Sequence, residues 1–203
     1  MATDPAIATV AATAALARSL DEVAAAARGC VACPELAAAR NTVVVGDCST
    51  GARLLLVGEA PGAQEDATGR PFVGRAGQLL DELLVSAGLR RGDVAVANVL
   101  KCRPPGNRPP RRPEARRCAG WLDRQVSLVD PEIVVSLGGS ALAWALGPGV
   151  RLTDVRGRAH PWRGRRLVPT YHPSAALRFG PNGAPRHALA ADLALAAELL
   201  CRS

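Results

Sequence analysis

The stretch from Leu54 to Leu84 constrains the fold of this chain more than any other part of the sequence. Leu54 to Val57 form a short apolar run that stops at Gly58, the pattern of a buried strand that leads into a loop. A glycine-rich segment with several carboxylates follows, and helical apolar spacing resumes over residues 74–87. The stretch therefore predicts a strand, a long loop and a helix. In open α/β sheets ligands bind beyond the carboxyl ends of the strands, so we expect this loop to form a pocket.

The loop carries no standard nucleotide-binding motif. No Gly-Lys-Ser/Thr follows it, which excludes a Walker loop, and the Gly-x-Gly-x-x-Gly spacing of a dinucleotide site is absent. Ordinary connections of this length are uncommon in compact domains. Phe72 and Val73 would be costly to leave in water, so a disordered linker is disfavoured as well. We therefore expect an ordered binding loop.

Apolar runs alternate with helical patterns along the rest of the chain. Further strands are predicted at 94–99, 133–137 and 166–170, and further helices at 7–28, 114–128, 141–146 and 186–200. A short extended piece is possible at 43–45. The alternation predicts a three-layer α/β/α sandwich around a central, mainly parallel four-stranded sheet. We divide the chain into an N-terminal helical extension, residues 1–28, and a single domain, residues 29–203.

Composition and charge restrict the function. With 203 residues, 48% of them apolar, the chain can build one substantial core. No apolar run reaches the length of a membrane span and no signal peptide opens the sequence, so we expect a soluble, intracellular protein. The net charge is +7, and arginines crowd the segments 103–117 and 156–166. This pattern favours a polyanionic partner such as nucleic acid, with a merely solvated basic face as the alternative.

Four cysteines form a candidate metal-binding set. Cys30 and Cys33 are a Cys-x-x-Cys pair, whereas Cys102 and Cys118 follow singly. Without a secretion signal, metal binding is favoured over a disulfide scaffold. Four thiolates could hold a [4Fe–4S] cluster or a structural zinc, and the lack of a second Cys-x-x-Cys pair favours the cluster. Plain structural thiols are the alternative, and the other two cysteines are expected to take no part.

Together these motifs closely resemble the family 4 uracil-DNA glycosylases, the iron–sulfur branch of that superfamily in bacteria and archaea. The matching segments, in order, are Gly58-Glu-Ala-Pro-Gly62, Glu65-Asp66, Gly69-Arg-Pro-Phe-Val-Gly74, Asn98-Val-Leu-Lys-Cys-Arg-Pro-Pro105 and His172-Pro-Ser174. The resemblance runs from about residue 28 to residue 200. It implies a uracil-DNA glycosylase fold, a monomer that acts in base excision repair on uracil-containing DNA, single- or double-stranded, and a cytoplasmic location at the nucleoid. It also implies a structural [4Fe–4S] cluster on Cys30, Cys33, Cys102 and Cys118.

The resemblance implies roles for individual residues as well. Glu65 and His172 are the expected catalytic pair: His172 stabilises the departing uracil anion, and Glu65 stabilises the sugar cation or orients the attacking water. Phe72 is expected to stack on the flipped base, and the Asn98 amide to pair with the uracil edge. The alternatives are a core phenylalanine and an asparagine that caps the end of a strand.

Glu59, Ala60 and Gly62 complete the expected base pocket. The best-known branch of the superfamily has an aspartate where this chain has Ala60, and a tyrosine where it has Gly62. Both differences are normal for family 4, but they leave open which group activates the water and how thymine is excluded.

The expected DNA contacts are Ser174, Leu177, Arg178, Arg111 and Arg112. Leu177 is the expected wedge that enters the base stack, with packing in a helix as the alternative. A related branch bonds covalently to DNA through a histidine in a basic insertion, whereas the loop 103–117 contains no histidine. This predicts a monofunctional glycosylase that turns over and leaves an abasic site. Lys101 is expected to be structural or to contact a phosphate, because its neighbour Cys102 would be tied to the cluster.

Two other functions are weighed against this one. A non-catalytic iron–sulfur module that binds nucleic acid would need none of the pocket residues, so their joint presence argues against it. A zinc-stabilised α/β hydrolase would need a nucleophile elbow or a catalytic zinc triad, and the sequence offers neither.

Overall fold

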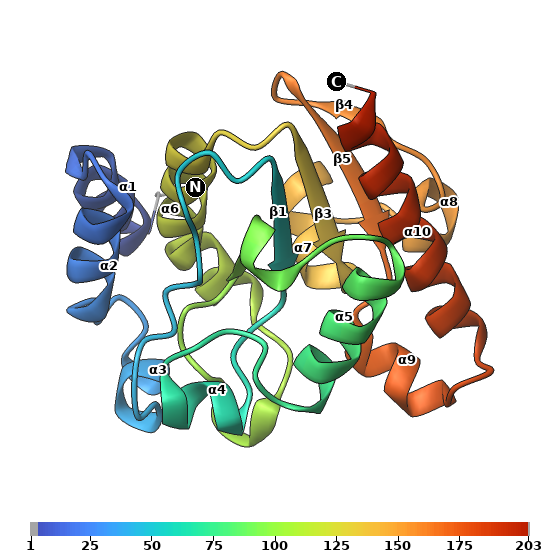
Figure 1. Cartoon of the computed structure of the whole chain (residues 1–203). Coiled ribbons are helices and arrows are strands. Elements are labelled where there is room, and N and C mark those ends of the chain that lie inside the picture. Colours follow the sequence, from blue (N-terminus) through green and yellow to red (C-terminus); the bar gives the residue numbers. More distant parts are fainter. Residues whose placement is uncertain (1–3, 203) are drawn as a thin grey trace.

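The computed structural model describes residues 4–202 and contains one mixed sheet between two layers of helices (Figure 1). The strand order is β2-β1-β3-β5-β4. The strands are β1 (Leu54–Gly58), β2 (Val94–Asn98), β3 (Ile133–Leu137), β4 (His160–Trp162) and β5 (Arg165–Thr170). Strands β1, β2, β3 and β5 run parallel, and β4 pairs antiparallel with β5 at the edge of the sheet. The predicted α/β class and mainly parallel sheet are therefore confirmed, with one short edge strand added.

The central strands read as unbroken apolar runs because both of their faces are covered. Every residue of β1, β2 and β3 is buried. Such burial is typical of parallel sheets with helices on both sides, where alternation of apolar and polar residues disappears. In the register of the sheet, Gly58 lies opposite Asn98 and Leu137 opposite Thr170. The carboxyl ends of the four parallel strands therefore lie side by side at the same end of the sheet.

Helices α5 (Arg75–Ser86), α9 (Pro173–Phe179) and α10 (Ala184–Cys201) cover one face of the sheet (Figure 1). Helices α6 (Arg112–Val129) and α7 (Gly138–Leu146) cover the other face. The sheet thus separates two apolar cores. The remaining short elements are α8 (Leu152–Val155), η1 (Arg91–Asp93) and η2 (Pro105–Asn107).

The N-terminal region forms a third core with α6. The predicted single helix over 7–28 is wrong: the chain forms α1 (Pro5–Leu16) and α2 (Leu20–Arg28), followed by α3 (Pro34–Ala39). Ser19 begins α2, because its hydroxyl accepts a hydrogen bond from the Glu22 N–H at 3.2 Å. Buried side chains of α1 and α2 pack against Trp121 of α6. The division of the chain at residues 28 and 29 stays a prediction.

Other differences from the sequence prediction are local. The loop after β1 is not irregular throughout, since it contains α4 (Ala63–Thr68). Residues 43–45 are not a strand, although the Val44 N–H donates to the Lys101 carbonyl at 2.8 Å. The edge strand β4 escaped prediction because three residues with a central proline give no apolar run. None of the helices within residues 4–202 is long and apolar enough to cross a bilayer.

Candidate active site

A pocket of about 530 Å³ opens at the carboxyl edge of the sheet, within the size range of small-molecule sites. The loops that follow β1, β2, β3 and β5 all contribute to it. The predicted site residues that it brings together are Glu59, Ala60, Gly62, Glu65, Phe72, Asn98, His172, Ser174 and Arg178. Leu177, Arg111 and Arg112 are not among its lining residues.

Asn98 presents an unused acceptor to this pocket. The residue ends β2 and is 2% exposed, and its Oδ1 atom is buried without a hydrogen-bond partner among the described residues. A buried acceptor without a partner is costly, so such atoms usually await a ligand or a water. The alternative of a strand-end cap would require Oδ1 to accept a backbone N–H, and none does so within residues 4–202.

Two glycines fix the ring of Phe72 beside this amide. Phe72 is 7% exposed and has a positive φ of 54°. A Cβ atom at Gly58 would lie 2.4 Å from both the Phe72 Cζ and the Asn98 Oδ1, and a Cβ at Gly77 would lie 1.7 Å from the Phe72 carbonyl oxygen. The ring centroids of Phe72 and His172 are 5.7 Å apart and their planes are tilted by 33°. Glycine at both positions therefore allows the ring to stand against the amide and the imidazole.

His172 follows β5, and its hydrogen bonds define its tautomer. The backbone N–H of Ser174 donates to His172 Nδ1 at 3.1 Å, and the Ser174 Oγ lies 2.8 Å from the same nitrogen. Nδ1 is therefore an acceptor, and the proton of a neutral imidazole resides on Nε2. Desolvation lowers the pKa of His172 to about 4, while the charge of Glu65 acts in the opposite direction. At neutral pH the ring is an uncharged donor through Nε2.

Glu65 holds the loop in place. Its carboxylate accepts hydrogen bonds from the backbone N–H groups of Gly62 at 3.0 Å, Val73 at 2.9 Å and Gly74 at 2.8 Å. These bonds join the start of α4 to the start of α5. The second carboxylate, Glu59, accepts a hydrogen bond from the Ser140 hydroxyl at 2.6 Å. Both carboxylates thus line the pocket in fixed positions.

Lys101 donates hydrogen bonds that hold Asn98 in place from the protein interior. It is fully buried, and its Nζ donates to the Asn98 carbonyl at 2.9 Å and to the Gln125 Oε1 at 2.5 Å. Burial lowers the pKa of Lys101 to about 8. These contacts fix the end of β2 from inside the protein, away from the pocket lining.

Cys30, Cys33, Cys102 and Cys118 line a second, smaller pocket between α3, α6 and the segment after β2. The Arg40 Nη1 donates to the Cys102 Sγ at 3.1 Å, and the Lys101 backbone N–H donates to the Cys118 Sγ at 3.4 Å. Arg117 also lines this pocket. Burial raises the pKa of the Cys118 thiol to about 12. Among residues 4–202, no three cysteine, histidine or carboxylate side chains are placed to hold one metal ion.

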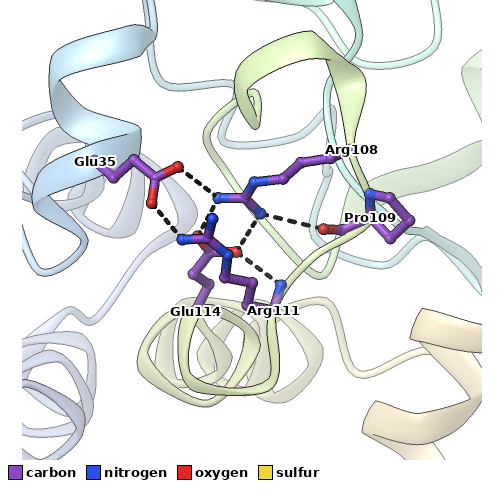
Figure 2. Close-up of polar contacts among 5 residues, drawn as sticks. All are labelled: Glu35, Arg108, Pro109, Arg111 and Glu114. Atoms are coloured by element: carbon purple, nitrogen blue, oxygen red, sulfur yellow. Dashed lines mark hydrogen bonds and ion pairs between the residues drawn. The ribbon is translucent and has the colours of Figure 1, made fainter.

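An ion-pair network holds the arginine-rich loop that borders the active pocket (Figure 2). Arg108 lines the pocket and donates to Glu114 at 2.6 and 2.9 Å and to Glu35 at 3.2 Å. Arg111 also pairs with Glu35. The Arg108 guanidinium is the main cause that lowers the pKa of each of these two carboxyls. The sequence predicted a basic segment from its charge, but it did not indicate which arginines pair with carboxylates of this chain.

The segment after His172 presents an aromatic residue that was not predicted to contact DNA. Phe179 ends α9 and is 64% exposed, whereas Leu177 is 36% exposed and Ala176 is buried. Gly183 packs against the backbone of Phe179, where a Cβ atom would lie 2.7 Å from the carbonyl oxygen. Arg178, between the two apolar residues, lines the active pocket. The signal in the sequence was an aromatic residue directly before Gly180.

Comparisons with known proteins agree with this arrangement. Residues 45–194 match the family model of the uracil DNA glycosylase superfamily. The chain is 48% identical over 155 residues to a type-4 uracil-DNA glycosylase of Thermotoga maritima, covering 75% of this chain and 80% of the relative. It is 43% identical over 159 residues to a type-4 uracil-DNA glycosylase of Pyrobaculum aerophilum, covering 74% and 81%. A type-5 uracil-DNA glycosylase of Mycobacterium tuberculosis is 32% identical over 194 residues, covering 74% and 70%.

Proposed function

Because this chain belongs to the type-4 uracil-DNA glycosylases of the uracil DNA glycosylase superfamily, we propose that it hydrolyses the N-glycosidic bond of uracil in DNA. The product is an abasic site, which base excision repair then processes. The observation that carries the proposal is the pocket in which an unpaired amide, an aromatic ring and a neutral imidazole donor converge. A protein that only binds nucleic acid would have no use for this combination.

Recognition of the base rests on Asn98 and Phe72. Uracil offers an N–H donor between two carbonyl acceptors, and the Asn98 amide supplies the complementary acceptor and donor. Its unpaired Oδ1 would accept the uracil N–H, whereas cytosine has an acceptor at that ring nitrogen and would leave Oδ1 unpaired. The buried Phe72 ring would stack on the base after it leaves the duplex.

Bond cleavage places negative charge on the departing uracil and positive charge on the sugar. His172 Nε2–H would donate to a uracil carbonyl and stabilise the anion where it forms. The imidazole is already neutral and held by Ser174, so it needs no proton transfer before the reaction. Glu65, close enough to affect the pKa of His172, would stabilise the sugar cation or orient water with the part of its carboxylate left free.

The remaining pocket residues divide into two roles. Glu59 and Ala60 would border the base on the side of β1. Gly62 would act through Glu65, because a Cβ atom at this position would lie 2.8 Å from the Glu65 Oε2. A glycine here therefore leaves room for the Glu65 carboxylate and its hydrogen bonds to the loop backbone.

Type-4 enzymes generally carry a [4Fe–4S] cluster, and we propose that Cys30, Cys33, Cys102 and Cys118 hold one here. The residues present fit this group. Four thiols border one pocket, and Arg40 and Arg117 offer positive charge against the negative charge of a thiolate-ligated cluster. A cluster binds each thiolate at a separate corner, which suits cysteines that do not converge on a single ion. The cluster would be structural, since hydrolysis transfers no electrons, and it would tie α3 to α6.

Ser174 and Arg178 would contact the DNA sugar–phosphate backbone next to the flipped nucleotide. We propose that the exposed Phe179 shares or takes over the wedge role expected of Leu177, because it offers more apolar surface to the base stack. A monomeric state and a cytoplasmic location stay predictions.

The proposal is tested by single-turnover release of uracil from a labelled oligonucleotide, with the products treated with and without alkali and also run on a denaturing protein gel. We expect strand cleavage that depends on alkali and no protein–DNA adduct. Asn98→Ala should lose release while the protein remains folded, and Gly92→Ala, in η1 and outside the pocket lining, is the control. Tight DNA binding without release by the wild-type protein would favour the binding module instead. An adduct would contradict hydrolytic turnover.

A further inference from the structure

A separate groove of about 320 Å³ lies between the N-terminal half of α6 and the length of α7. Its walls are mostly small and apolar, with one aromatic residue, Trp144, and two arginines, Arg112 and Arg116. The Trp144 ring is fixed, because its Nε1 donates to Asp123 at 3.2 Å and its ring lies 5.2 Å from that of Trp162. The groove thus combines a rigid aromatic wall with positive charge.

The structure separates the arginines around this groove into two groups. Arg108 and Arg111 pair with Glu35 and Glu114, as Figure 2 shows, and Arg117 pairs with Asp4. Arg112 and Arg116 are exposed, lie one turn apart on α6, and form no salt bridge or hydrogen bond with any residue in the described range 4–202. No carboxylate among the described residues lines the groove. Its two cations are therefore available to an anionic ligand, and the positive N-terminal end of α6 adds to the same field.

The groove adjoins the uracil pocket. Pro109 lines the uracil pocket and the next residue, Pro110, lines the groove. Ser140 lines the groove, and its hydroxyl donates to Glu59 of the uracil pocket at 2.6 Å. The two sites are therefore direct neighbours, and the groove is placed to take a nucleotide next to a uracil in the pocket.

We propose that this groove binds one unpaired nucleotide of the uracil-bearing strand, close to the flipped uracil. Arg112 and Arg116 would hold a phosphate, and the base would lie against Trp144 and the alanines of α6 and α7. Among the described lining residues, the uncharged side chains with polar groups are Ser140 and Trp144. The Ser140 hydroxyl donates to Glu59 and the Trp144 N–H donates to Asp123, so little remains to read base edges and the site would accept any base. The inference rests on the proposed function, because it requires uracil to anchor the strand.

The test is equilibrium binding of single-stranded oligonucleotides that carry one uracil on a sugar resistant to hydrolysis. One flanking nucleotide at a time is replaced by an abasic spacer. For the wild-type protein, one flank position should weaken binding about 10-fold when its base is removed, since a stacked base contributes on this scale. Ala143→Phe fills the groove from an exposed position of α7 and should abolish that position dependence. Ala191→Phe, exposed on α10, is the matched control and should behave like the wild type.

Charge is tested on the same oligonucleotides. Arg116→Ala should reduce the slope of log K against log salt by about one unit, as expected for a lost phosphate contact. Arg111→Ala should change the slope less, because Glu35 already offsets that charge. Equal spacer profiles for the wild type and Ala143→Phe would overturn the proposal. Uracil release from a natural oligonucleotide by both proteins would show that such a failure concerns the groove and not the glycosylase function.

Discussion

Gly58→Ala should inactivate the enzyme by a displacement that can be worked out from the structure. The added Cβ would lie 2.4 Å from the Phe72 Cζ and from the Asn98 Oδ1, whereas ordinary contacts begin near 3.4 Å. The ring cannot simply withdraw, because the Phe72 backbone already contacts Gly77 of α5. The ring and amide must therefore separate from the methyl group by about 1 Å. A displacement of this size in a catalytic site costs roughly 100-fold in rate.

The same substitution should cost about 1–3 kcal/mol of the free energy of unfolding, as is typical of overpacking. For a chain of this length that lowers Tm by roughly 2–12 °C, which leaves a folded protein at the assay temperature. Single-turnover uracil release and thermal unfolding would be measured together. Gly92→Ala is the control, since a Cβ there meets nothing within 4 Å. A folded Gly58→Ala protein with a rate within about threefold of wild type would refute the geometric argument.

Three further predictions concern the imidazole, the cluster and the wedge. The pKa of His172 lies below its unfolded value, so the unfolded chain binds more protons between about pH 4 and 6.5. The contribution of His172 to the free energy of unfolding is therefore complete above about pH 6.5 and is lost as the pH falls toward 4. The single-turnover rate should show no titration of His172 between about pH 6 and 8. Cys102→Ala should lose the visible absorption band, solubility and DNA binding before it alters the chemistry, and a folded, colourless, fully active variant would contradict this. Phe179→Ala should slow release from duplex DNA about 10-fold and leave single-stranded DNA unaffected, whereas a larger effect of Leu177→Ala would return the wedge role to that residue.

The sequence predicted the central sheet well because its strands are buried on both faces. A strand such as β1 is an unbroken apolar run that ends at a glycine, and few other structures produce that pattern. The break between α1 and α2 was missed although Ser19 and Glu22 have the spacing of a helix start. Alanine-rich apolar periodicity continues across the break and concealed it.

The residue types in the site could be predicted, but the tautomer of the histidine and the ion-pair partners of the arginines could not. The sequence indicated His172 as a donor, yet its tautomer depends on the Ser174 N–H in the first turn of α9. Arg111 and Arg112 are adjacent in the sequence and equivalent by composition. Only tertiary structure places Glu35 beside Arg111 and leaves Arg112 facing the groove. Partners distant in the chain decide such differences, and local patterns contain no information about them.

The order of the strands along the chain has a consequence for synthesis on the ribosome. The four cysteines proposed to hold the cluster and the walls of the groove precede residue 149, whereas His172 follows β5, the last strand to be made. β5 must then pair with β3 on one side and β4 on the other before the imidazole can reach Phe72. A nascent chain would thus make the proposed cluster ligands and the arginine-rich loop 103–117 first. The capacity to cut the glycosidic bond is the last property that this polypeptide acquires.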